Sequence, residues 1–146
     1  MNTMHIKTKN GYIDIYIDQF FPCSQARFRF LFKTIREFIW LNNVQEMTEQ
    51  LKENFTNRIS TMETQKKIAS TQYFAYMQEH ADYRAMVESK KHPNGLPLTK
   101  EELKEFREKA SAAKRTANVY HSNFKENERK ITALKKNLEM LNSLEM

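Results

Sequence analysis

Apolar residues recur at alternating three- and four-residue steps along the last third of the chain, from Leu103 to Leu141. This spacing places all of them along one side of an α-helix, as in a coiled coil. The repeating positions, with one polar member, are Leu103, Phe106, Ala110, Ala113, Ala117, Tyr120, Phe124, Asn127, Ile131, Leu134, Leu138 and Leu141. Thr99 and Glu102 form a capping box just before the first of them. The pattern predicts one long helix that begins at this box.

A second stretch, from Val44 to about Lys91, has the same 3-then-4 spacing and contains neither Gly nor Pro. Its repeating positions are Phe55, Ile59, Met62, Lys66, Ala69, Tyr73, Tyr76, His80, Tyr83 and Val87. Only a short loop at 92–98, rich in Pro and Gly, separates it from the last helix. A loop this short makes the two helices antiparallel neighbours.

The loop position also predicts which residues of the two helices face each other. If the loop is centred near Gly95, residues whose numbers add to about 190 lie opposite. The predicted pairs include Tyr83 with Phe106, His80 with Ala110, and Lys66 with Phe124. Several of the other pairs place a large side chain against an alanine, in both directions, as close packing requires.

Residues 1–20 alternate between apolar and polar positions around Asn10 and Gly11, which predicts a β-hairpin with a two-residue turn. If these two residues form the turn, residues whose numbers add to 21 face each other. One face then pairs Ile6 with Ile15 and Met4 with Ile17. The other pairs His5 with Tyr16 and Lys7 with Asp14. A lone hairpin is marginally stable in water, so its apolar face must rest on another element.

Residues 24–42 supply that element, an amphipathic basic helix that Ser24 can cap. Its apolar stripe consists of Phe28, Leu31, Phe32, Ile35, Phe38 and Ile39. Asn43 and Glu46 then form a capping box for the following helix. The expected fold is mainly α: a long antiparallel coiled-coil hairpin (43–146) with a compact base made of the β-hairpin and the short Phe-rich helix. We expect a single domain over 1–146.

Composition agrees with this reading, because the 146 residues include only 2 Gly and 3 Pro. That scarcity excludes folds with many turns and leaves little for a Gly-rich phosphate loop. The single cysteine, Cys23, excludes an internal disulfide framework. The chain shows no signal peptide, and no apolar run approaches the ~20 residues of a membrane span. We expect a cytoplasmic protein.

The net charge of +6 is unevenly distributed. Segments 24–41 and 93–146 each carry an excess of three basic residues, whereas 1–23 and 42–92 are balanced. The candidate partner-binding residues are basic side chains at three places and one Trp, a residue type that often anchors interfaces. They are Arg29, Lys33, Arg36 and Trp40 in the base, Lys90, Lys91 and Lys100 at the tip, and Arg115, Arg129 and Lys136 along the last helix.

The sequence offers little for catalysis. It has no HExxH, nucleophile elbow, P-loop or CxxC motif, and its four His residues lack metal-ligand spacing. Arg115 and His121 have the R-x5-H spacing, which resembles the short motif of the all-helical HEPN ribonucleases. On a helix these two side chains would lie about 120° apart, and Thr116 is a poor match for the polar residue that usually follows the Arg. We expect a non-enzymatic protein without cofactor or metal.

In style, this small basic chain with a coiled-coil arm resembles accessory proteins of phages and other mobile elements, some of which inhibit host nucleases as anti-CRISPR proteins do. The resemblance implies an accessory or inhibitor protein that acts sterically on nucleic-acid machinery. Its expected partner is a protein or a nucleoprotein complex. Two alternatives stay open: direct DNA or RNA binding through the basic helix faces, and a coiled-coil scaffold or assembly factor whose arms pair between copies as a homodimer or larger species.

Overall fold

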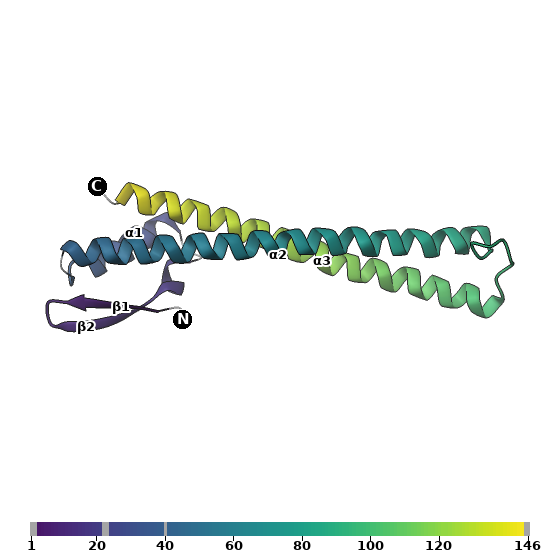
Figure 1. The fold of residues 1–146 in the computed structure, drawn as a ribbon, viewed down its shortest axis with the longest axis horizontal. Helices are drawn as coiled ribbons and strands as arrows, with labels where there is room; N and C mark the ends of the chain where they lie inside the picture. The colour runs from purple at the N-terminus through teal and green to yellow at the C-terminus, as the bar shows by residue number, and fades with distance from the viewer. Residues whose placement is uncertain (1–2, 22–23, 40, 145–146) are drawn as a thin grey trace. The chain divides into compact units, whose positions relative to one another are not determined.

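The computed structural model describes residues 3–21, 24–39 and 41–144. A β-hairpin of β1 (Thr3–Thr8) and β2 (Gly11–Tyr16) leads into a 3-10 turn, η1 (Ile17–Phe20). Three helices follow: α1 (Gln25–Arg36), α2 (Leu41–Ser89) and α3 (Lys100–Leu144) (Figure 1). The two long helices pack against each other. The predicted fold, mainly helical with a long helical hairpin and an N-terminal β-hairpin, is confirmed.

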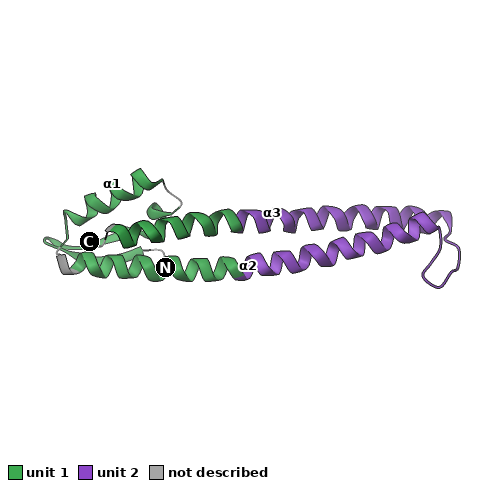
Figure 2. Cartoon of the chain, turned by 90° about the horizontal axis from the view of Figure 1, so that it is seen from above, with its two compact units in different colours: residues 1–63, 128–146 green, residues 64–127 purple. Residues whose placement is uncertain are grey.

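The chain divides into two compact units, which are coloured separately in Figure 2. Unit 1 comprises residues 1–63 and 128–146, and unit 2 comprises residues 64–127. The hairpin, α1, the first part of α2 and the last part of α3 therefore belong to unit 1. Unit 2 consists of the remaining parts of α2 and α3 with the loop that joins them.

The β-hairpin forms, but its predicted register is wrong by two residues. Met4 pairs with Ile15 and Ile6 with Ile13, so that Lys9 and Asn10 make the turn. Gly11 has φ +119°, a conformation that favours glycine. A type I′ turn would need positive φ at Asn10 as well. Among the described residues, however, Lys90 is the only non-glycine with positive φ.

This error of two residues leaves the apolar face intact, because side chains along a strand alternate with a period of two. Met4, Ile6, Ile15 and Ile17 are all buried, as the pattern predicted. The polar partners do change. His5 now faces Asp14, with 2.7 Å between Nδ1 and Oδ1.

The short helix α1 is capped as predicted, since the Arg27 N–H donates to Ser24 Oγ at 3.2 Å. It ends at Arg36, however, and not at residue 42. The chain leaves the helix there, and Ile39 forms a β-bridge with Thr8 that buries it beside the hairpin. Phe38, predicted in the buried stripe, is consequently 61% exposed.

The predicted capping box at Asn43 is also wrong, because α2 begins at Leu41. Asn43 lies within the first turn, and its side-chain amide donates to the carbonyl oxygen of Lys7 at 2.8 Å. The residue thus links the start of α2 to the hairpin. Asn43 therefore makes a tertiary hydrogen bond in place of the predicted local capping bond.

The core of unit 1 lies between the hairpin, η1, α1 and the two long helices. Phe28 is its aromatic centre: its ring lies 5.3 Å from Phe20 and 6.4 Å from Phe55, measured between centroids. Leu134 and Leu141 of α3 are fully buried in the same core. A buried amide adds a polar link, because Asn137 Nδ2 donates to the carbonyl oxygen of Phe20 at 2.8 Å.

In unit 2 the two long helices meet in the predicted register. The rings of Tyr83 and Phe106 stack at 5.7 Å between centroids. Lys66 Nζ lies 5.0 Å from the centre of the Phe124 ring. The larger seam residues are half-buried, whereas four alanines of the seam are buried: Ala69, Ala110, Ala113 and Ala117.

Replacing Phe28 with Ala should lower the free energy of unfolding by about 3–5 kcal/mol, because it leaves a cavity in the unit 1 core. Phe30→Ala is the matched control: it lies on the same helix, is 68% exposed, and should change stability by less than about 0.5 kcal/mol. Urea unfolding followed by circular dichroism measures both. Similar losses for the two variants would contradict the assignment of the buried face of α1.

Ala113→Leu should destabilise the helix pair of unit 2 by about 1–3 kcal/mol, because the larger side chain cannot fit the closed seam. Ala112→Leu places the same side chain on the next, exposed residue and should be nearly neutral. Thermal unfolding of the two variants checks this. An equal shift in Tm would show that the seam is open at Ala113.

Candidate functional site

A groove of about 620 Å³ lies along α2 and α3 within unit 2. Most of its lining residues have basic or neutral polar side chains. The lining residues are His80, Arg84 and Val87 from α2, and Arg107, Ala110, Ser111, Lys114, Arg115 and Asn118 from α3. None of them is acidic, so the groove carries four formal positive charges.

Helical periodicity explains why α3 supplies so much of this lining. Arg107, Ser111, Lys114, Arg115 and Asn118 follow one another at steps of four, three, one and three residues, which keeps them on one side of the helix. This side adjoins the buried seam formed by the alanines, so the long cationic chains flank a floor of small residues.

His80 fixes the opposite wall. Its Nδ1 donates to the carbonyl oxygen of Ala110 at 2.7 Å, a direct link from α2 to the backbone of α3. Arg84 lies one helical turn further along α2 and also lines the groove. The predicted seam position of His80 is therefore confirmed, and its ring forms part of the groove wall.

The groove cations are poorly neutralised. Arg84 has a weak i,i+4 pair with Glu88, at 3.3 Å and exposed to solvent. Within the described residues, Arg107, Lys114 and Arg115 form no ion pair. The nearby carboxylate of Glu105 is held by Lys109 at 2.9 Å, and this hydrogen bond raises the pKa of Lys109.

Of the residues predicted to bind a partner, only Arg115 lines this groove. Arg29, Lys33 and Arg36 lie exposed on α1 in unit 1, and Trp40 lies outside the described residues. Lys90, Lys91 and Lys100 are exposed around the loop of unit 2. Partner binding by any of them stays a prediction.

The predicted stripe of Arg115, Arg129 and Lys136 is divided between the two units, with Arg115 in unit 2 and the others in unit 1. All three side chains are exposed. The regular leucines near the end of α3 are used within the chain: Leu141 is fully buried in the unit 1 core, and Leu138 packs against it.

Sequence reasoning missed Arg84, Arg107 and Lys114. One signal was present, because no acidic residue occurs between Lys109 and Lys125. Averaging charge over 42–92 concealed Arg84, since that segment has no net charge. The predicted helix register could have placed Arg84 close to Arg107 across the seam.

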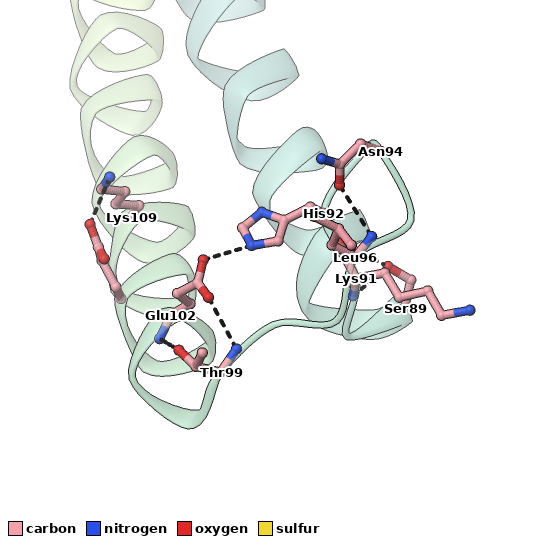
Figure 3. Close-up of polar contacts among 9 residues, drawn as sticks. Ser89, Lys91, His92, Asn94, Leu96, Thr99, Glu102 and Lys109 are labelled. Atoms are coloured by element: carbon pink, nitrogen blue, oxygen red, sulfur yellow. Dashed lines mark hydrogen bonds and ion pairs between the residues drawn. The ribbon is translucent and has the colours of Figure 1, made fainter.

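The loop between the long helices is ordered by local hydrogen bonds (Figure 3). The capping box is confirmed: Glu102 N–H donates to Thr99 Oγ1 at 3.1 Å, and Thr99 N–H donates to Glu102 Oε1 at 3.2 Å. His92 Nε2 lies 2.6 Å from the other carboxylate oxygen of Glu102. Asn94 Oδ1 accepts from the Leu96 N–H at 3.1 Å. These contacts hold the loop against the first turn of α3.

Arg115 and His121, the pair with R-x5-H spacing, have different surroundings. Arg115 lines the groove, whereas the ring of His121 contacts Tyr73 at 5.3 Å between centroids. Within the described residues, no group of three His, Cys, Asp or Glu side chains is arranged to hold a metal ion. No described helix carries a segment long and apolar enough to cross a membrane.

No family model, curated protein or solved structure matches this chain.

The pKa of the Glu102 carboxyl should lie below its ordinary value of 4.5, chiefly because it accepts the Thr99 backbone N–H and secondarily because His92 is close. A carbon-detected NMR titration measures this pKa. His92→Ala should move it upward without restoring 4.5, since the Thr99 hydrogen bonds remain.

Because the pKa of the Glu102 carboxyl is lowered in the folded state, the ordered loop is less stable at low pH. The ionised carboxylate stabilises the ordered loop above the unfolded pKa, and this contribution disappears as the pH falls through the folded value. The protection factors for amide hydrogen exchange in the first turn of α3, which are corrected for the intrinsic pH dependence of exchange, should therefore fall on acidification, and less so in Glu102→Gln. A Glu102 pKa at or above 4.5 would contradict the contacts shown in Figure 3.

Proposed function

We propose that this chain is a non-enzymatic interaction protein that binds an anionic partner in nucleic-acid machinery through the groove of unit 2. It acts as an accessory or inhibitor protein, of the kind that mobile elements carry, by occupying a surface rather than by converting a substrate. The observation that supports this proposal is the set of four groove cations, Arg84, Arg107, Lys114 and Arg115, with no acidic residue among the lining.

The electrostatics favour partner binding at this place. Exposed charges are screened over about 8 Å at physiological salt, so a partner senses local charge more than the net charge of the chain. Three of the four cations have no carboxylate partner within the described residues. A partner anion therefore does not have to displace an internal one.

The helix pair also suits a steric mechanism. The seam residues of α2 and α3 are interlocked by ring stacking and by the hydrogen bond from His80 to Ala110. The groove walls are thus held before a partner arrives. A surface arranged in advance loses less conformational entropy on binding.

The test is site-specific photocrosslinking of the full chain in its native host. A photoreactive phenylalanine analogue replaces Ser111, which lines the groove, or Ala112, the exposed neighbouring residue outside it. We expect a discrete adduct from position 111 and little from position 112. Digestion with nuclease or protease then identifies the partner as nucleic acid or protein.

Charge reversal provides the specificity control. Arg107→Glu combined with Arg115→Glu, introduced beside the photoreactive residue at 111, should abolish the adduct while circular dichroism shows the same helix content. Equal adducts from positions 111 and 112, or an adduct unaffected by charge reversal, would overturn the proposal.

A further inference from the structure

We infer that the unit 2 groove binds the phosphodiester backbone of a nucleic acid, without reading its bases. This inference rests on the proposed function and specifies its partner. It assigns the contacts to Arg84, Arg107, Lys114 and Arg115, with Ser111 and Asn118 as neutral donors.

The residue types are those that proteins use on phosphates. Half or more of protein–DNA hydrogen bonds go to phosphate and sugar oxygens, mainly from Arg, Lys, Ser, Asn and similar donors. Arg adds a planar fork that matches two phosphate oxygens. A carboxylate in the lining would repel phosphate, and this lining contains none.

The length of the lining favours a chain of phosphates over a single anion. From Arg107 to Asn118 the helix rises by about 16 Å, at 1.5 Å per residue. Polar donors occur on successive turns over that whole distance. A small anion would occupy one turn only, whereas a nucleic-acid backbone presents a negative charge at each nucleotide.

The same lining is poorly suited to a folded protein. Protein interfaces depend on a few buried aromatic or apolar anchors seated in pockets. Here the apolar lining residues are Val87 and Ala110, and no Phe, Tyr or Trp takes part. A cationic groove that lacks large apolar anchor residues favours a polyanion as its partner.

Base readout is not expected from this geometry. Proteins that hold single strands by their bases stack them on aromatic rings. The aromatic rings of this helix pair contact one another instead: Tyr76 stacks with Tyr120 at 5.7 Å, and Tyr83 stacks with Phe106. Binding should therefore be independent of base sequence.

Fluorescence anisotropy with labelled single-stranded oligonucleotides of about 30 nucleotides tests this inference on the intact chain. Four phosphate contacts predict that log Kd rises with log salt concentration with a slope of about 3, at ~0.7 per contact for single strands. Oligo(dT) and oligo(dA) should bind with Kd values within about threefold of each other, since only the backbone is contacted.

Two triple variants with equal changes in charge separate the groove from general electrostatics. The groove variant carries Arg107→Glu, Lys114→Glu and Arg115→Glu. The control variant carries Lys104→Glu, Lys125→Glu and Lys135→Glu, all at exposed positions of α3 outside the groove. Loss of three phosphate contacts should weaken binding about 100-fold at 100 mM salt. The control should retain most of the affinity, and circular dichroism verifies that both fold.

The outcomes also separate this inference from the proposed function. Absence of binding at low salt, equal losses in the two triple variants, or a strong preference for one base would overturn the phosphate assignment. If the groove photoadduct at 111 is then a protein, the proposed function stands and only the nucleic-acid inference fails. If anisotropy is negative and no groove adduct forms, both fail.

Discussion

The packing of α2 against α3 with no third element beside them governs unit 2. Two helices alone can enclose only the side chains directly between them, so full burial is confined to small residues. Ala69, Ala110, Ala113 and Ala117 occupy those positions, while Tyr76, Tyr83 and other large seam residues remain half-buried. The backbones can approach closely at the alanines. The long cationic side chains of the groove therefore stand beside a narrow floor.

In unit 1, by contrast, additional elements pack against the two long helices and close the core. The hairpin, η1 and α1 cover the apolar sides of α2 and α3, and Phe20, Phe28 and Phe32 are fully buried as a result. Two amides tie these elements to the long helices: Asn43 to Lys7, and Asn137 to Phe20. Because a two-stranded hairpin is marginal alone, these contacts are what make it part of a stable unit.

The local arrangement of charged side chains differs from what the charge of each segment suggests. The segment that contains Arg84 is neutral by count, and α3 carries many glutamates. Yet at the groove four cations converge with no acidic neighbour in the lining, while Glu105 is engaged by Lys109 and Glu102 by the loop. Because exposed charges are screened over about 8 Å, this local arrangement is more informative than the net charge of +6.

The sequence by itself determined the long helices, the register that brings Tyr83 to Phe106 and His80 to Ala110, and the caps at Ser24 and Thr99. These features follow from periodicity, a short loop and contacts a few residues apart. Only the tertiary structure decided the hairpin register, the end of α1 and the role of Asn43, because each depends on burial or on a partner distant in the chain. The groove combines the two classes: the predicted register already brings Arg84 near Arg107, whereas the cavity and the burial of Ala110 within it exist only after the helices pack.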